Sequence, residues 1–175
     1  MGIANIMSTV KLKRWMKRGL RVGNDFKLEK GASIDPSFPW LIEIGDQVTI
    51  APNVLILAHD GSTKSFINYS KIGKVKIGNR VFIGAKSIIL PNVTIGDNVV
   101  IGAGSIVIHD VPSNSVVAGA PACVISSLDT FIEKNKEIMK RTVLYDSTYT
   151  IAGKVTEEKK NAMKHSLSKG IAYID

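Results

Sequence analysis

Large aliphatic residues recur at every sixth position over much of this chain, and Gly often follows them. The clearest run takes every sixth residue from Ile77 to Ile101, and an earlier run starts at Ile44 and Ile50. A helix repeats every 3.6 residues and a strand every two, so neither explains a period of six. The period predicts an all-β hexapeptide parallel β-helix, in which three hexapeptides form a triangular coil and coils stack on one another.

Breaks in this rhythm divide the chain. Residues 1–20 are basic, with apolar residues at near-helical spacing, and predict a short helix that caps the open apolar end of the coils. The β-helix itself is expected over 21–126, as about four to five coils with an insertion at 35–43 and a long excursion at 58–76. Residues 127–175 predict a helical tail.

The residues between the aliphatic positions predict tight corners. Gly follows the aliphatic residue in many repeats, and Asn occurs later in several. Both residue types tolerate φ > 0, so we expect them to supply left-handed backbone at the turns.

The composition of the chain indicates the cellular compartment in which the protein is expected. Cys123 is the single cysteine, which rules out an internal disulfide and fits a reducing, cytoplasmic setting. Lys and Arg within residues 11–21 interrupt the stretch where a secretory signal would be apolar, so we expect no export. No apolar run approaches the ~20 residues of a membrane span.

The net charge of +8 leaves several kinds of partner open. Nucleic acid is not favoured, because aromatic residues make up only 6% of the chain. A phosphate-bearing ligand and a simply solvated basic surface both remain consistent with the charge. The basic N-terminal helix also fits a membrane surface, but the capping role is favoured over membrane association.

A set of motifs in one order makes the prediction more specific. They are I44-G-D-Q-V-T-I-A-P-N-V, A58-H59-D60, I77-G-N-R-V-F-I-G-A, I89-L-P-N-V-T-I-G-D-N-V-V-I-G-A-G-S, D110-V-P-S-N-S and A118-G-A-P. This order resembles the hexapeptide-repeat acyltransferases, above all the branch with maltose and galactoside O-acetyltransferases and the O-acetyltransferases of surface polysaccharides. The resemblance implies a left-handed β-helix, a homotrimer with active sites between subunits, acetyl-CoA as co-substrate, and no metal.

His59 opens the long excursion, where the resemblance places a catalytic histidine. Transfer of an acetyl group to a hydroxyl needs a base that is largely neutral near pH 7, and imidazole meets that need. The two other histidines are His109, in the outermost coil, and His165, in the polar tail. The acceptor hydroxyl can attack a thioester directly, so Cys123 is not needed as a nucleophile.

A carboxylate is expected to orient the imidazole. Asp60 is adjacent and is the first candidate, while Asp35 in the earlier insertion, Asn53 and a backbone carbonyl remain alternatives. The developing oxyanion needs a hydrogen-bond donor, and the resemblance assigns the backbone N–H of Ala85.

The resemblance also implies residues for the two substrates. The expected acetyl-CoA groove runs along the coils and contains Gly84, Ala85, Gly102, Ala103, Gly104, Ser105, Ile108, His109, Ala118, Pro121 and Cys123. At Ile108, His109 and Cys123 the chain departs from the Thr-Lys pair and the basic residue of many relatives. The acceptor site is expected to include Asp35, Trp40, Asn53, Lys64, Tyr69 and Lys71, with Phe38 and Phe66 favoured as packing residues.

Four functions remain in view. O-acetylation of a sugar hydroxyl in surface polysaccharide or lipopolysaccharide synthesis is preferred, and N-acetylation of an amino sugar needs the same base and donor. A zinc enzyme on the same coil needs three clustered histidines, and the central region has one. A purely structural β-helix would have no use for His59.

Overall fold

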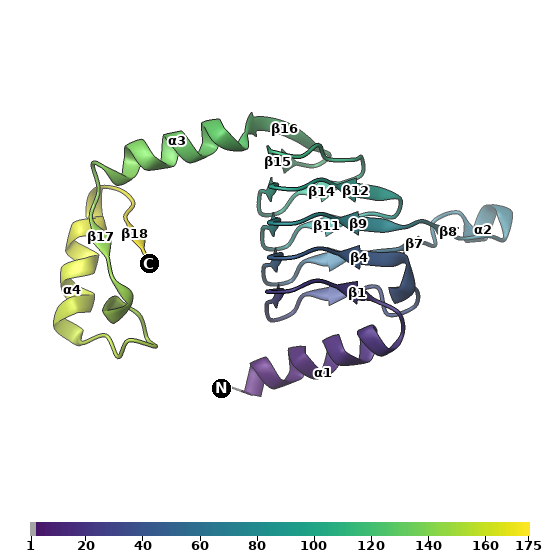
Figure 1. The fold of residues 1–175 in the computed structure, drawn as a ribbon, viewed down its shortest axis with the longest axis horizontal. Coiled ribbons are helices and arrows are strands. Elements are labelled where there is room, and N and C mark those ends of the chain that lie inside the picture. Colours follow the sequence, from purple (N-terminus) through teal and green to yellow (C-terminus); the bar gives the residue numbers. More distant parts are fainter. Residues whose placement is uncertain (1–2) are drawn as a thin grey trace. The chain divides into compact units, whose positions relative to one another are not determined.

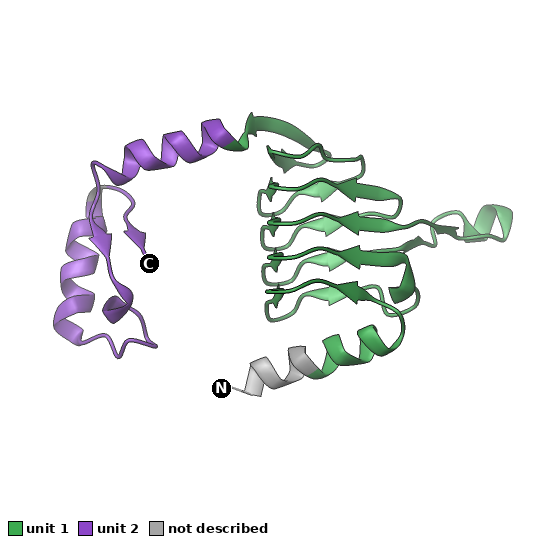
Figure 2. Ribbon diagram, viewed as in Figure 1, with its two compact units in different colours: residues 1–128 green, residues 129–175 purple. Residues whose placement is uncertain are grey.

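The computed structural model describes residues 3–175, with the side chains of residues 10–168 and 170–175. The first two residues of the predicted helical cap lie outside the described residues. The chain forms two compact units, residues 1–128 and residues 129–175 (Figure 2). The first unit contains the repeats, and the second contains most of the predicted tail.

The repeats build a stack of triangular coils (Figure 1). The complete coils are β1 (Arg21–Val22), β2 (Lys27–Leu28), β3 (Ser33–Ile34); β4 (Ile42–Ile44), β5 (Thr49–Ile50), β6 (Leu55–Ile56); β9 (Val75–Ile77), β10 (Phe82–Ile83), β11 (Ile88–Ile89); and β12 (Val93–Ile95), β13 (Val100–Ile101), β14 (Ile106–Val107). The strands pair in parallel to make three faces. The first face is β1-β4-β9-β12, the second contains β2-β5-β10-β13, and the third is β3-β6-β11-β14.

The six-residue period is the period of the core. Each aliphatic position pairs with its equivalent in the next coil, as in the ladder Ile50, Ile83, Ile101 on the second face. Equivalent ladders run through the first and third faces, and from the second coil to the fourth their members are at most 4% exposed. Stacked Ile and Val thus fill the interior, which explains the scarcity of aromatic residues.

The backbone at the corners shows that the predicted role of glycine was wrong. The glycine after the aliphatic residue does not supply the left-handed backbone, because φ > 0 occurs two positions later, at residues that include Gln47, Arg80 and Asn98. The glycine is needed for a different reason. A Cβ on Gly78 would lie 2.5 Å from Asp97 Oδ1 and 2.8 Å from the carbonyl of Gly96 in the next coil. Glycine therefore permits close coil stacking, and the residue two positions later, which is Asn, Gln or Arg in different coils, carries the turn.

Polar side chains reinforce the same corner between coils. Asp46 Oδ1 accepts a hydrogen bond from the Asn24 N–H of the previous coil at 2.6 Å. Asn79 and Asp97 repeat this contact one and two coils further on, at 2.9 and 2.6 Å. Ser113 Oγ completes the ladder by accepting from the Asp97 N–H. Backbone donors that the strands leave unpaired are thereby satisfied.

Helix α1 (Ile3–Lys17) lies across the open end of the first coil (Figure 1). Trp15 and Leu20 are 6% and 3% exposed and belong to the same core cluster as the coil residues, and Leu12 packs against that cluster. Gly19 follows the helix with φ +100°. Residues near the end of α1 thus cover apolar side chains of the first coil.

The other end of the stack closes with an antiparallel hairpin. β15 (Ser115–Gly119) continues the second face and pairs in parallel with β13. β16 (Ala122–Ser127) then returns along β15, which the six-residue rhythm alone does not predict.

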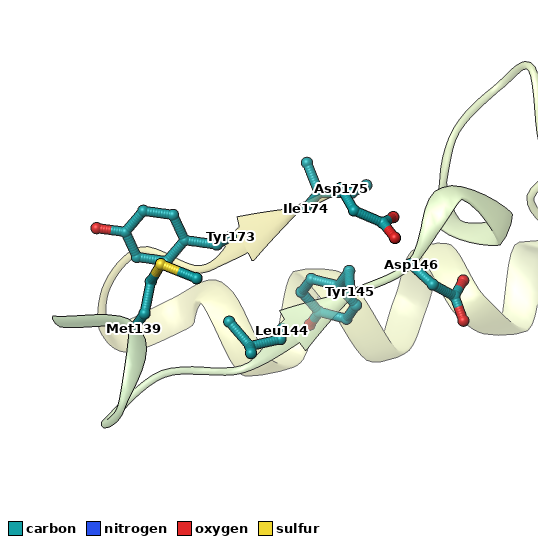
Figure 3. Close-up of a pocket in the computed structure, with 7 residues that line it drawn as sticks. All are labelled: Met139, Leu144, Tyr145, Asp146, Tyr173, Ile174 and Asp175. Carbon is teal, nitrogen blue, oxygen red and sulfur yellow. The ribbon is translucent and has the colours of Figure 1, made fainter. Parts of the chain in front are cut away.

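The C-terminal unit is small and mostly helical. Its elements are α3 (Leu128–Met139), which begins one residue before the unit, β17 (Leu144–Tyr145), η2 (Ser147–Tyr149), α4 (Glu157–Ser166), η3 (Leu167–Lys169) and β18 (Tyr173–Ile174). β17 and β18 pair in parallel and border a pocket of about 470 Å³ (Figure 3). The pocket contains none of the residues predicted for chemistry. No helix in the described part of the chain is long and apolar enough to cross a membrane.

We expect Gly78→Ala to lower the free energy of unfolding by about 1–3 kcal/mol, because its Cβ would overlap backbone of the next coil. Gly61→Ala is the matched control, since its Cβ would meet only Ser70 Oγ at 4.0 Å. Urea denaturation measures both. Equal stability of the two variants would contradict the close-approach explanation.

Candidate active site

His59 stands where the chain leaves the coils. It follows β6 and opens a hairpin made of β7 (His59–Asp60), α2 (Lys64–Ile67) and β8 (Lys71–Ile72), which projects away from the stack (Figure 1). The chain rejoins the coils at β9. The excursion predicted from the broken rhythm is therefore an ordered hairpin with His59 at its base.

Asp35 holds the imidazole of His59. Asp35 Oδ2 lies 2.5 Å from His59 Nδ1, and the carboxylate is 1% exposed. The same oxygen accepts from the Ala58 N–H at 2.9 Å, and Oδ1 accepts from the Ser37 N–H at 2.9 Å. Asp35 follows β3, one coil below β6, so stacking of the two coils brings the pair together.

These contacts set the ionisation of Asp35. Burial by itself would raise its pKa, but hydrogen bonds from His59 and from the backbone of Ala58 and Ser37 outweigh burial and leave the pKa below its usual value. The carboxylate is therefore charged at neutral pH and accepts a proton-bearing Nδ1. Nε2 of a neutral His59 is then the nitrogen that can take a proton.

Aromatic residues of the 35–43 insertion line one side of His59. The Phe38 ring lies 5.4 Å from the His59 ring, and the Trp40 ring lies 5.6 Å from Phe38 in an edge-on arrangement. Phe38 is half-buried, whereas Trp40 is 53% exposed. The sequence suggested packing for Phe38 but not its contact with the imidazole.

Asp60 has a different partner from the predicted one. Its carboxylate pairs with Lys71 Nζ at 2.6 Å across β7 and β8 and accepts from the Ser62 N–H at 2.8 Å. The Lys71 hydrogen bond, followed by those from Ser62, lowers the pKa of Asp60 to about 2. This geometry moves the orienting contact from Asp60 to Asp35, and it places Lys71 in the hairpin ion pair.

Many of the residues predicted to bind acetyl-CoA gather at another corner of the prism. Gly84 and Ala85 follow β10, and Gly102 to Gly104 follow β13, all between the second and third faces. Ala103 and Gly104 are exposed, and the Ala85 carbonyl accepts from the Gly104 N–H. Asn53 follows β5 at this same corner, away from His59. One full face of the same chain separates this corner from His59.

The remaining predicted cofactor residues divide between the two corners. Ile108 and His109 follow β14 and so share the His59 corner, and both are exposed. Ala118, Pro121 and Cys123 belong to the β15–β16 hairpin, where Ala118 pairs with Cys123. The single-chain structure therefore does not bring the predicted groove into one continuous surface.

Among the residues predicted to bind acetyl-CoA, Ser105 has a structural role. It is fully buried, and its Oγ donates to the Gly102 carbonyl at 2.6 Å and accepts from the Gly119 N–H at 3.3 Å. Its hydroxyl thus ties β15 to the corner below. In the acceptor set, Lys64 and Tyr69 are exposed on the hairpin.

Comparison with known proteins shows which family and which solved structures this chain is similar to. The family model described as bacterial transferase hexapeptide (six repeats) matches residues 74–109. A galactoside acetyltransferase solved with coenzyme A is 38% identical, with a TM-score of 0.59, over 66% of this chain and 58% of that one. A maltose O-acetyltransferase from Clostridium difficile 630 is also 38% identical, with a TM-score of 0.53, over 62% and 59% of the two chains. The chain thus spans about three fifths of these solved structures.

Protein CapG of Staphylococcus aureus is similar over a greater length. It is 41% identical over 153 residues, which are 83% of this chain and 89% of that protein. The chain belongs to the hexapeptide-repeat acyltransferase superfamily. Membership agrees with the stacked coils and identifies the protein as an acyltransferase.

We expect Asp35→Ala to lower the free energy of unfolding by about 2–4 kcal/mol, because it leaves the buried Ala58 N–H and the partly buried Ser37 N–H without their acceptor and removes the buried partner of His59. Asp60→Ala is the control, and its loss should be small because the Lys71 pair is exposed to solvent. Denaturant unfolding compares the variants, and an equal loss in both would contradict the buried role of Asp35.

The pH dependence of unfolding tests the charge on Asp35. The folded-state pKa of Asp35 lies below the ordinary pKa of an aspartate, so its stabilising contribution is fully present above the ordinary pKa and is lost as the pH falls through the folded-state pKa. The stability difference between wild type and Asp35→Asn should therefore shrink below about pH 4. A difference that grows with acidification would show that Asp35 is not held as a carboxylate.

Proposed function

We propose that this protein transfers the acetyl group of acetyl-CoA to a sugar hydroxyl, with His59 as general base. The carrying observation is the buried Asp35–His59 contact, which leaves Nε2 of a solvent-accessible imidazole ready to accept a proton. A family that includes acetyltransferases with bound coenzyme A supports the choice of donor.

The proposed reaction runs in two proton-balanced steps. Nε2 of His59 takes the proton of the acceptor hydroxyl as its oxygen attacks the thioester carbonyl. The tetrahedral oxyanion then collapses, the carbon–sulfur bond breaks, and the leaving thiolate takes the proton back from Nε2. Asp35 stabilises the transient imidazolium through Nδ1. We assign the backbone N–H of Ala85 as donor to the oxyanion.

The residues proposed for catalysis lie at two separate corners of one chain. An assembly of several copies could bring these two corners together. Outward residues on the third face form an apolar ladder of Leu55, Ile88 and Ile106. On the second face, exposed Phe82 pairs with Val100. We propose a homotrimer of left-handed coils, in which the His59 corner of one copy meets the Gly84 corner of the next.

The first face contrasts with these two. Its outward positions include Arg21, Glu43 and Lys76, in register with one another, and Arg21 pairs with Glu43 at 2.8 Å. Charged positions of this kind are suited to solvent rather than to an interface core. A ring of copies uses two different surfaces per subunit. The third face and the Phe82–Val100 part of the second face supply apolar outward residues for two such surfaces, although Lys27 and Thr49 precede Phe82 on the second face.

The acceptor site is proposed on the hairpin side of His59. Trp40 and Tyr69 expose aromatic rings of the kind that stack on sugars, and Lys64 supplies a positive charge nearby in the hairpin. We propose a polysaccharide or lipopolysaccharide precursor as the acceptor. The single cysteine favours the cytoplasm as the site of the reaction.

We expect His59→Ala to lower kcat/KM by about 10²–10⁴-fold, as removal of a general base does. Asp35→Asn should lower kcat by about 10²-fold with little change in KM for acetyl-CoA, because the imidazole loses its orienting charge. Release of free thiol from acetyl-CoA, measured against a panel of sugars and amino sugars, checks both.

Asp60→Asn is the matched control, because it removes a carboxylate next to His59 without touching Nδ1. It should retain activity close to wild type. Undiminished turnover in His59→Ala would eliminate the mechanism, and exclusive use of amino groups would replace O-acetylation by N-acetylation.

We expect Ile88→Glu to convert the trimer into monomers and to abolish turnover, because it places a charge in the centre of the apolar ladder. Thr94→Glu, an outward position on the first face that pairs with Lys76, is the control and should remain trimeric. Light scattering after size-exclusion chromatography gives the mass. A fully active monomeric variant would contradict a shared active site.

A further inference from the structure

Helix α1 has two sides with different surroundings. Trp15 and Leu12 turn towards the coils and are packed in or against the core. Val10, Lys13, Arg14 and Lys17 are all exposed. They follow the i, i+3, i+4, i+7 spacing at which residues share one helix face. Capping the coils therefore occupies one side of α1 and leaves this outer face to solvent.

The outer face is unusually basic. Residues 1–24 contain Lys11, Lys13, Arg14, Lys17, Arg18 and Arg21 and no acidic residue. Within the part of the chain whose side chains are described, Arg21 pairs with Glu43, and the five cations of residues 11–18 form no ion pair. A second copy of α1 would be repelled by this charge, so the face is suited to an anionic partner.

Apolar residues accompany the cations. Val10 is 61% exposed and Met16 is 46% exposed, beside the basic positions. In the sequence, Met7, Ile6 and Ile3 precede Val10 by three, four and seven residues. Basic and apolar residues combined on one helix are typical of helices that lie in the interface of an anionic bilayer. A solvated polyanion would use the charges but not the exposed apolar groups.

We propose that the outer face of α1 docks on the surface of a membrane containing anionic phospholipids. The cations contact the headgroups, and Val10 and Met16 enter the boundary between headgroups and acyl chains. The helix lies on the membrane and does not cross it. In the proposed trimer, related copies would present their α1 helices at the same end, which would strengthen attachment.

The end of α1 adjoins the acceptor side of the active site. A Cβ on Gly19 would lie 2.7 Å from Trp40 Cβ, so the two residues are in close contact. Trp40 stacks edge-on against Phe38, which contacts His59. Docking would therefore present the acceptor side of the site to substrates at a membrane surface. This last step rests on the proposed function, whereas docking itself does not.

The test is co-sedimentation of the full chain with phosphatidylcholine vesicles that contain or lack about 30% phosphatidylglycerol. Wild type should bind the anionic vesicles and not the neutral ones, and about 0.5 M salt should release it, because that salt screens surface charges. Lys13→Gln/Arg14→Gln/Lys17→Gln should weaken binding roughly 100-fold, since each cation near an anionic surface contributes about fivefold.

The matched control is Lys134→Gln/Lys154→Gln/Lys164→Gln, which removes the same charge from exposed positions of the C-terminal unit. It should bind within about twofold of wild type if α1 carries the interaction. Equal weakening in both triple variants would overturn the proposal in favour of a general effect of net charge. Failure of wild type to bind anionic vesicles would also overturn it.

Val10→Ser/Met16→Ser keeps the charge and tests entry into the bilayer. Binding should weaken about tenfold, because the apolar groups no longer gain from burial. Unchanged binding would reassign the face to soluble polyanions. Thermal unfolding that matches wild type would show that each variant remains folded. Thiol release from acetyl-CoA in solution is measured separately, so failure of docking and failure of the proposed reaction can be distinguished.

Discussion

The backbone of each coil must lie within hydrogen-bonding distance of the next, about 4.8 Å away. This spacing determines which residues are tolerated at the corners. Gly78 is in close contact with Asp97 and Gly96 of the following coil, and no larger residue fits there without displacement. The side-chain ladder through Asp46, Asn79, Asp97 and Ser113 joins the same corner from coil to coil. Core packing and the positions of the functional residues both follow from this stacking.

Stacking also explains how two residues distant in sequence form the candidate catalytic pair. Asp35 and His59 both leave the third face at the same corner, one coil apart, after strands that pair in parallel. The coil spacing therefore places a buried carboxylate beside Nδ1, with backbone N–H groups as additional donors. Such a pair keeps its geometry because each carboxylate oxygen has defined partners. The exposed Asp60–Lys71 pair instead joins the two strands of the hairpin.

The two ends of the coil stack are closed in different ways. A returning strand, β16, closes one end, and α1 covers the other with Trp15 and Leu20. The covering helix needs apolar residues on only one side. Its remaining surface is open to a second role, and its position beside Trp40 connects that surface to the acceptor side of His59. A single structural requirement, closure of the core, thus places a basic surface next to the candidate active site.

The sequence by itself determined the coils, because a six-residue period is a direct consequence of one inward side chain per strand. It also located His59, since a break in a strict repeat is visible without any structure. It could not choose among Asp60, Asp35 and Asn53, because adjacency in sequence says little about which side chains meet across coils. The sequence led to the wrong explanation for the corner glycines, which was a need for positive φ. Only the stacked structure shows that glycine is needed there because the next coil leaves no room for a side chain. The tertiary structure alone placed Asp35 at Nδ1 and separated the Gly84 corner from His59, because those relations depend on register between coils and on the face to which each corner belongs.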